Sequence, residues 1–423
     1  MPRPKPASAR AIHAARNISD LERRAFRCLP GPIWHYLQGG ADDEWTAARN
    51  TSSFDRYALV PDVLIDVSSI DSSARFLGRE HPLPLLLSPT GMSQLFHAGG
   101  ELAVARAAAA TGIPYTLSTM ATTTIEEVAV AGGPRIFQLY CFRDRALTLD
   151  LLSRAQASGY EALCLTVDTP VAGNRERDLA TGMTLPPRFS LRTLLEFTAH
   201  PRWLLPKLLG KPFELANVVG YAPAVSDRRT GIIQYVNEQM DRSVGWKDLE
   251  WLRARWSRAL LVKGISSAAD ARRVADLGCD GIMISNHGGR QLDGAATPIE
   301  LLPPVRDAVG DALSVIVDGG VRRGTHVLKA IALGANACSI GRPYLYGLAA
   351  AGERGVARVI EIFREEIERG MALMGCPKLN MLSRRHLVRI DAGFLLAPPA
   401  ARSDAGGSGD HTARRREAAA SAP

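Results

Sequence analysis

The sequence has few cysteines and no long apolar run. Its six cysteines are widely spaced, without a Cys-x-x-Cys pair or a cysteine and histidine cluster at zinc spacing. We therefore expect neither a disulfide scaffold nor a metal site. No stretch approaches the roughly 18 apolar residues of a membrane-spanning helix, and the N-terminus lacks the apolar run of a secretory signal. These absences favour a globular protein of the reducing cytoplasm.

The composition is that of a folded, soluble chain with a basic excess. Hydrophobic residues make up 46% of the 423 positions and charged residues 22%, with a net charge of +8. Such a charge suits nucleic acid, an anionic membrane surface or small acidic molecules. The basic residues are scattered or lie in the ends and in one internal segment, and they form no continuous patch for a nucleic-acid backbone. We therefore expect no nucleic-acid partner.

Both ends of the chain are poor in large apolar residues. Residues 1–17 are rich in Ala, Arg and Pro, which favours a disordered basic tail over a transit peptide. Residues 397–423 contain almost nothing that could be buried, and they predict a second disordered tail. Residues 18–396 are then expected to form one domain.

Eight short apolar runs recur between the tails, most of them followed by an Ala-rich helical stretch. Their continuous apolar character predicts strands that are covered on both faces, as in a parallel sheet. We predict an α/β fold, a (β/α)8 TIM barrel, with an N-terminal helical extension over Phe26–Leu37 and a closing helix over Ala357–Met374. A doubly wound open sheet is the alternative. The eight runs are Leu83–Ser88, Pro114–Ser118, Arg135–Leu139, Ala162–Val167, Leu260–Lys263, Gly281–Ser285, Ser314–Asp318 and Ala335–Ile340.

Polar residues at the ends of these runs favour the barrel. In a barrel all carboxyl ends of the strands meet at one rim, where catalytic residues gather. The candidates are Thr90, Ser118, Gln138, Tyr140, Thr166, Asp168, Lys263, Ser285, His287, Asp318 and Arg342.

A long insertion separates the fourth and fifth strands, and we place it at residues 176–245. Its middle part, Met183–Asn217, mixes leucines and aromatic residues with basic ones. This mixture suits a segment that lies in the interface of an anionic membrane. A lid that packs on its own barrel or on a neighbouring subunit explains it equally well.

The two segments after the seventh and eighth strands predict a phosphate site. Asp318–Gly324 is glycine-rich, and Gly341-Arg342-Pro343 follows the next strand. Glycines let backbone N–H groups approach a phosphate, and arginine adds a fork of donors. We expect a phosphate-bearing cofactor or substrate at these adjacent strand ends.

Three side chains on the predicted rim suggest acid–base chemistry. His287 stands three residues before Arg290, so a base beside an anion-binding group is the preferred interpretation. Asp168 can orient the imidazole, or it can cap a helix in the turn that follows it. Lys263 can stabilise negative charge on a cofactor ring, or its ammonium can extend to solvent.

The segment Ser285-Asn286-His287-Gly288-Gly289-Arg290-Gln291-Leu292-Asp293 resembles the active-site signature of the FMN-dependent L-2-hydroxy acid dehydrogenase/oxidase family. That family includes glycolate oxidase, flavocytochrome b2, bacterial L-lactate dehydrogenase and (S)-mandelate dehydrogenase. The resemblance extends from about Ile18 to Ser383 and takes in all eight strands in order.

The resemblance implies that the cofactor is FMN. It places Pro89, Thr90 and Gly91 against the ring, and Ser118, Gln138 and Thr166 along its edge. It places Lys263 beside the part of the ring that becomes negative on reduction. The other implied cofactor positions are Ser285, Asp318, Gly319, Gly320, Arg322, Gly341 and Arg342, most of them at the ribityl chain and phosphate.

The resemblance also implies how the substrate is held. Arg290 and Arg175 would bind its carboxylate, and Tyr36 and Tyr140 would contact the carboxylate or the 2-hydroxyl. His287 would act as the base, with Asp168 stabilising the imidazolium. Proton abstraction from carbon and hydride transfer with loss of the hydroxyl proton use the same residues, so both routes stay open.

Where the sequence departs from the family pattern, it indicates which substrate and which electron acceptor to expect. The chain has Ser118-Thr119-Met120 where glycolate oxidases carry a tryptophan, and a flexible methionine leaves room for a larger acid. Ala199–Trp203 and Ser243–Arg253 resemble the membrane-associated lactate and mandelate dehydrogenases, which reduce quinones. We expect oxidation of L-lactate to pyruvate at the cytoplasmic face of the inner membrane, with contact through 183–217. The tract Gly173–Leu179 resembles the mandelate enzymes equally, so (S)-mandelate comes second, and an oxygen-using oxidase third.

A homotetramer is expected, because family members are commonly tetramers. A non-enzymatic barrel that binds phosphate or lipid is the hypothesis from another class. The sequence argues against it, because a binding protein would not require the following residues together: Tyr36, Tyr140, Arg175, His287 and Arg290.

Overall fold

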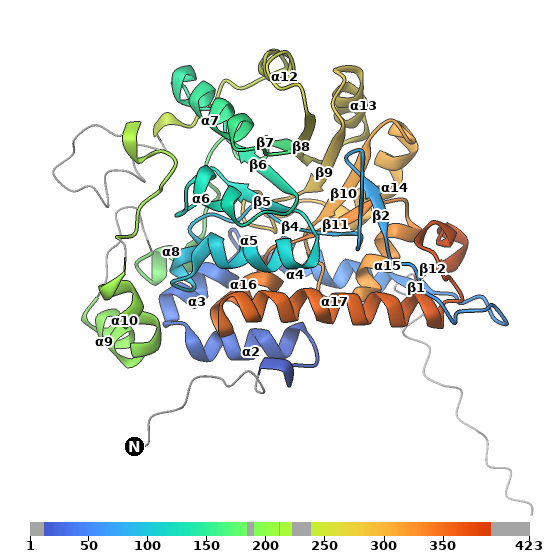
Figure 1. Ribbon diagram of the computed structural model, residues 1–423, viewed down its shortest axis with the longest axis horizontal. Coiled ribbons are helices and arrows are strands. Elements are labelled where there is room, and N and C mark those ends of the chain that lie inside the picture. The colour runs from blue at the N-terminus through green and yellow to red at the C-terminus, as the bar shows by residue number, and fades with distance from the viewer. Residues whose placement is uncertain (1–11, 184–189, 211, 222–237, 391–423) are drawn as a thin grey trace, which may run out of the picture. The chain divides into compact units, whose positions relative to one another are not determined.

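The strands of the protein form a closed parallel barrel, seen in a computed structural model that describes residues 12–183, 190–210, 212–221 and 238–390. The barrel order is β10-β11-β4-β5-β6-β7-β8-β9, and β9 pairs with β10 to close it (Figure 1). This confirms the TIM barrel and excludes the open sheet. The strands are β4 (Leu85–Leu87), β5 (Tyr115–Ser118), β6 (Arg135–Leu139), β7 (Ala162–Thr166), β8 (Ala259–Ile265), β9 (Gly281–Ser285), β10 (Ser314–Asp318) and β11 (Ala337–Ile340).

Helices connect successive strands and cover the barrel. The connecting helices are α5 (Gly100–Thr111), α6 (Ile125–Val130), α7 (Arg145–Ala157), α12 (Trp246–Arg253), α13 (Ala268–Asp276), α14 (Pro298–Val309) and α15 (Gly324–Ala332). After β11 the chain forms α16 (Arg342–Ala351) and α17 (Glu353–Leu373). The long α17 packs against α16, α15 and α5, and it is the predicted closing helix with an earlier start (Figure 1).

The barrel interior is a small apolar core of its own. Inward-facing residues from seven of the strands pack together, among them Leu86, Cys164 and Met283. The antiparallel hairpin of β2 (Ala74–Phe76) and β3 (Arg79–His81) adds Phe76 to this core, and its side chain is fully buried there. The interior is therefore filled with side chains, which leaves the carboxyl rim as the place for a site.

Two expectations for the N-terminal part were wrong. The single helix over Phe26–Leu37 is in fact α2 (Ile18–Cys28) and α3 (Gly31–Gln38), because Pro30 has no N–H and holds Leu29 in an extended conformation. We also expected the tail to reach residue 17. The side chains of Ile12 and Ala15 are buried instead, and Arg358 donates to the Ala15 carbonyl. The earlier residues and the predicted C-terminal tail lie outside the described part of the chain.

The extension continues into α4 (Trp45–Ser52) and the strand β1 (Tyr57–Leu59), which pairs with β12 (Leu387–Arg389). Residues from Ile12 to Arg389 belong to one compact unit, in which α4 lies against the loop that follows β9.

The insertion after β7 contains α8 (Glu176–Ala180), α9 (Leu191–Ala199) and α10 (Pro201–Leu209). Both α8 and α9 contact α3, and α9 and α10 form a helical pair beside it (Figure 1). Of the helices in the described residues, none has the length and apolar character needed to cross a bilayer.

Candidate active site

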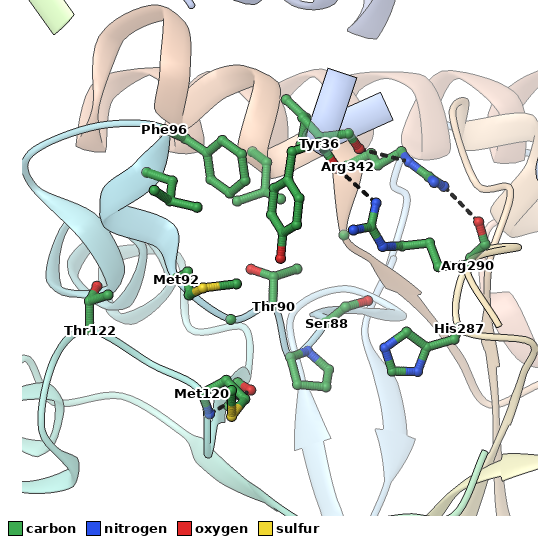
Figure 2. Close-up of a pocket in the computed structure, with 18 of the residues that line it drawn as sticks. Tyr36, Ser88, Thr90, Met92, Phe96, Met120, Thr122, His287, Arg290 and Arg342 are labelled. Carbon is green, nitrogen blue, oxygen red and sulfur yellow. Dashed lines mark hydrogen bonds between the residues drawn. The ribbon is translucent and has the colours of Figure 1, made fainter. Parts of the chain in front are cut away.

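The carboxyl ends of the barrel strands surround one large cavity. Its volume is about 1140 Å3, above the roughly 300–1,000 Å3 that is typical of small-molecule sites. Figure 2 shows His287 and Arg290 on one side of it and Met92, Met120 and Phe96 on the other. The predicted site residues that line the cavity are Tyr36, Pro89, Thr90, Gly91, Ser118, Tyr140, Arg175, Lys263, His287, Arg290, Asp318, Gly319, Gly320, Arg322, Gly341 and Arg342.

His287 and Asp168 form a hydrogen-bonded pair. The Nδ1 atom of His287 lies 2.9 Å from Oδ1 of Asp168. A carboxylate only accepts, so Nδ1 donates and Nε2 is left with the lone pair that a base needs. Burial opposes the charge on Asp168, but Lys263 and His287 outweigh it and lower the pKa of this carboxyl to about 2. Helix capping is excluded for Asp168, since the next described helix, α8, has Arg175 as its N-cap.

The backbone aims His287 at the cavity. His287 has a φ of 57°, and the next two residues, Gly288 and Gly289, also have positive φ. A left-handed conformation is strained in a histidine and persists only where its surroundings hold it. Here the backbone N–H of His287 donates to the Ser285 hydroxyl, and Asn286 exchanges two side-chain hydrogen bonds with Asn50 of α4.

Lys263 lies deep in the rim and does not extend to solvent. Only 3% of the residue is exposed. Its Nζ donates to the Ser285 hydroxyl at 2.8 Å and lies 3.2 Å from Oδ2 of Asp318 and 3.6 Å from Oδ2 of Asp168. Burial opposes its charge, but the two carboxylates outweigh burial and raise the pKa of Lys263. A permanent positive charge therefore faces the cavity from β8.

Gly264 makes this arrangement sterically feasible. It sits at the irregularity between β8 and β9 with a φ of 106°. A Cβ at this position would lie 2.6 Å from the Cβ of Asp168. Glycine thus allows Asp168 and Lys263 to stand side by side at the ends of β7 and β8.

Arginines gather on the side of the cavity next to α3. Arg290 donates to the backbone carbonyl of Tyr36 (Figure 2). Arg290 and Arg342 both donate to the backbone carbonyl of Gly39. The guanidinium carbons of Arg290 and Arg175 lie 5.0 and 5.7 Å from the Tyr36 ring centre. Burial and the neighbouring Arg175 lower the pKa of Arg290, while burial and Arg290 lower that of Arg342 to about 10. Converging positive charge of this kind favours a bound anion.

The turn after β10 depends on its glycines. Gly319 and Gly320 have φ values of 135° and 78°. A Cβ on Gly320 would lie 1.8 Å from the carbonyl oxygen of Asn50, so only glycine fits. The turn leads past Arg322 into the N-terminus of α15, a combination suited to a phosphate.

Hydrogen bonds join the ends of β5, β6 and β7. Ser118 donates to the Gln138 side-chain oxygen at 3.0 Å, and the Gln138 amide donates to Thr166 at 3.0 Å. Gln138 and Thr166 are buried behind the lining residues. Tyr140 follows the same strand end, and burial together with the charge of Asp168 raises the pKa of its hydroxyl.

Three supporting residues were not predicted from the sequence. Ser88 donates to Oδ1 of Asp318 at 2.7 Å, and its place at the end of the first apolar run was the available signal. Asp178 lies 3.0 Å from Nε of Arg175, a contact that the three-residue spacing on one helix could have suggested. No sequence signal near Asn50 could have indicated its role, since its partner Asn286 is 236 positions away.

The side chains fit FMN. The cavity has room for a ring system and a small substrate together. The glycine turn with Arg322 and Arg342 suits the phosphate, and Lys263 suits a ring that becomes negative on reduction. The apolar surfaces of Met92 and Met120 complete the wall opposite His287 (Figure 2).

Comparisons with known proteins agree with this chemistry. The profile of the family described as FMN-dependent dehydrogenase matches residues 25–389. The chain is 44% identical over 386 residues to a provisionally named L-lactate dehydrogenase of Mycobacterium tuberculosis (strain ATCC 25618 / H37Rv), covering 90% of this chain and 91% of that protein. It is 42% identical over 372 residues to glycolate oxidase of Spinacia oleracea, covering 88% and 95%.

A solved structure is similar as well. The crystal structure of the monotopic membrane protein (S)-mandelate dehydrogenase is 39% identical, with a TM-score of 0.84 over 89% of this chain and all of that one. Sequence, fold and the character of the cavity thus lead to one conclusion. The chain belongs to the FMN-dependent dehydrogenase family, whose members use FMN to oxidise the CH–OH group of 2-hydroxy acids.

Proposed function

We propose that the protein oxidises L-lactate to pyruvate and passes the electrons to a quinone at a membrane surface. The family accounts for FMN-dependent oxidation of a 2-hydroxy acid, and the particular acid, acceptor and location are the proposal. Its main support is the His287–Asp168 pair, which faces the cavity beside the cluster of half-buried arginines.

The arginines bind the carboxylate of the substrate in this proposal. Arg290 and Arg175 both lie over the Tyr36 ring, so a carboxylate placed there would meet two guanidinium groups. Arg175 is itself held by Asp178. Charge-assisted hydrogen bonds of this kind fix the plane of the carboxylate and, with it, the position of the adjacent carbon.

His287 takes the proton. Its Nδ1 is engaged by Asp168, so Nε2 is the atom that removes a proton from the α-carbon or from the 2-hydroxyl. The carboxylate of Asp168 then stabilises the imidazolium that results. Tyr140 and Tyr36 supply hydroxyl groups to the substrate oxygens.

Bound FMN supplies the two-electron acceptor for this oxidation. Of the chain's own groups, Lys263 contributes a fixed positive charge to the same cavity, held by Asp168 and Asp318. This charge favours any state in which negative charge accumulates nearby, without reorganisation during the reaction.

The wall opposite His287 bears on the choice of acid. Met92, Met120 and Phe96 form an apolar surface there (Figure 2). Lactate carries one methyl group, which this wall accommodates, and methionines can also adapt to a phenyl ring. The same observation supports (S)-mandelate as the second candidate, together with the likeness to the (S)-mandelate dehydrogenase structure.

The outer surface of the insertion supports the membrane contact. Six leucines of α9 and α10 are exposed, and Arg202 is exposed beside them. Exposed apolar side chains with a basic neighbour suit the interface of an anionic bilayer. The six are Leu191, Leu194, Leu195, Leu205, Leu208 and Leu209.

Sedimentation with vesicles tests this contact. Leu208→Asp with Leu209→Asp should abolish co-sedimentation with phosphatidylglycerol vesicles, whereas Leu373→Asp, at an exposed leucine of α17, should not. Binding retained by the double variant would refute the contact.

We extend the proposal to a homotetramer at the cytoplasmic face of the inner membrane, and light scattering of the purified protein would test the tetramer.

An anaerobic panel of acids tests the reaction itself. L-lactate should bleach the flavin absorbance faster than (S)-mandelate or glycolate, and decylubiquinone should restore the absorbance faster than oxygen. Faster bleaching by mandelate would reassign the substrate, and rapid recovery with oxygen would make the protein an oxidase. A preparation that no 2-hydroxy acid bleaches would leave only a binding protein.

A further inference from the structure

The cavity extends well beyond the space needed by a small acid. Figure 2 shows Phe96, Met92 and Thr122 on the side away from His287. In that direction the wall passes to the insertion, where Phe197 of α9 and Trp203 of α10 line the same cavity. Their rings stack on each other with centres 5.2 Å apart. This far part of the cavity, which we call the α10 pocket, therefore combines apolar and aromatic side chains with the hydroxyl of Thr122.

The α10 pocket contains the cationic side chain of Lys207. Lys207 of α10 lines the cavity, and its Nζ lies 4.9 Å from the centre of the Trp203 ring. In the described residues its hydrogen-bond partner is the backbone carbonyl of Gln94. The negative charge of Glu101 acts on Lys207 from a distance, and this carboxylate already accepts hydrogen bonds from Ser93 and Thr122.

Lys207 thus has donors to spare. An ammonium carries three N–H groups, and the Gln94 carbonyl uses one of them. Burial lowers the pKa of Lys207 to about 8, because the apolar surroundings disfavour its charge. A charged group held in such a place is explained if a ligand supplies the acceptor that the described residues do not.

The α10 pocket adjoins the expected cofactor position. Trp203 donates to the carbonyl of Leu95 at 2.6 Å and Lys207 donates to that of Gln94. Both carbonyls belong to the loop that begins with Pro89-Thr90-Gly91. Gln94 lies three positions after Gly91, so their Cα atoms are at most about 11 Å apart. A ligand bound at Lys207 is therefore close to the ring that Gly91 would contact.

The other face of the same helices carries the exposed leucines. Leu205, Leu208 and Leu209 point away from the cavity side that Trp203 and Lys207 occupy, since they are 54–86% exposed. One short helix thus separates the inner pocket from the surface that we assign to the membrane. A lipid-soluble ligand would reach the pocket from that surface without crossing water.

We propose that the α10 pocket binds the quinone, with its ring against the aromatic side chains that line the pocket and with Lys207 donating to a quinone carbonyl. This inference rests on the proposed dehydrogenase function and specifies where its acceptor binds. The net reaction balances: the acid loses two electrons and two protons in becoming the 2-oxo acid, and the quinone gains both in becoming the quinol. Lys207 is a binding residue for the acceptor and takes no part in binding the acid.

Steady-state kinetics of the FMN-loaded protein with decylubiquinone test the proposal. Lys207→Met should raise the KM for decylubiquinone about tenfold or more, as expected for the loss of a charge-assisted hydrogen bond. Anaerobic bleaching by the acid and turnover with ferricyanide, which needs no apolar pocket, should be unchanged. Lys207→Arg keeps N–H donors and should retain most of the affinity. Lys247→Met, at an exposed lysine of α12, is the matched control.

Each outcome decides between the alternatives. If Lys207→Met reduces decylubiquinone with the wild-type KM, the assignment of the pocket is wrong. If it raises the KM for the acid instead, the pocket holds the substrate's side chain. If bleaching, ferricyanide turnover and quinone turnover all fall together, Lys207 only supports the fold. A wild-type protein that is bleached by the acid but not reoxidised by decylubiquinone would instead refute the proposed acceptor.

Discussion

Replacing Asp168 with asparagine isolates the charge of this carboxylate from its position. The asparagine side-chain oxygen can still accept the hydrogen bond from Nδ1 of His287, so the tautomer and the direction of the ring are kept. What is lost is the negative charge that stabilises the imidazolium after proton transfer. Lys263 keeps its second carboxylate, Asp318, at 3.2 Å. Asp168→Asn should therefore leave FMN bound and act on the chemical step.

The structure sets the size of the effect. The Asp168 side chain is only 11% exposed, and it keeps a pKa of about 2 against the burial that would otherwise raise it. Its charge therefore interacts strongly with Lys263 and His287. A hydrogen bond to a charged group contributes on the order of 1.5–3 kcal/mol. Asparagine keeps this hydrogen bond but not the negative charge that roughly doubles its strength. Losing about half of the contribution in the state that follows proton transfer predicts flavin reduction slower by roughly 3- to 10-fold.

Stopped-flow bleaching of the flavin by the acid, without oxygen, measures this step directly. Asp307→Asn is the control, since Asp307 is exposed and pairs with Arg384 away from the cavity. Flavin content and the KM for the acid should change little in Asp168→Asn. A reduction rate equal to that of wild type would show that the carboxylate does not stabilise the imidazolium, and loss of FMN would show a structural role instead.

Three further predictions follow from the same geometry. Arg290→Met should raise the KM for the acid about tenfold or more while FMN stays bound, and unchanged steady-state kinetics would remove Arg290 from the substrate site. Gly320→Ala should yield protein with little flavin, because its Cβ would overlap the Asn50 carbonyl; a normal ratio of flavin to protein absorbance would contradict this. The lowered pKa of Asp168, about 2 against an ordinary 3.8, stabilises the fold by roughly 2 kcal/mol above pH 4. That contribution falls to roughly half at pH 3 and is mostly lost at pH 2, so the difference in urea stability between wild type and Asp168→Asn should be about half as large at pH 3 as at pH 6.

The barrel was predictable because its signal is local. Each parallel strand is a continuous apolar run, and β6, β9 and β10 begin and end at the predicted residues. The rim residues were predictable for the same reason, since a barrel brings every strand end to one face. The break at Leu29–Pro30 was missed although proline is a local signal, because the apolar pattern continues on both sides of it.

Contacts between distant segments were not predictable. Asn50 meets Asn286 only because α4 returns to the loop after β9, and no periodicity encodes that approach. The two readings of Lys263 and Asp168 also needed the structure, since each depends on the other at 3.6 Å. For Asp168, capping and pairing with an imidazole require the same residue type in the same turn.

The insertion after β7 shows why one sequence segment supported two interpretations. A lid and a membrane contact both call for apolar and basic residues, and composition cannot tell which face of a helix each occupies. In the structure α10 has a face suited to each role: Trp203 and Lys207 turn inward to carbonyls of the loop after β4, while Leu208 and Leu209 are exposed. A helix with these two faces links the cavity to the outer surface. Substitutions on the inner face should therefore change quinone kinetics, and substitutions on the outer face should change membrane binding alone.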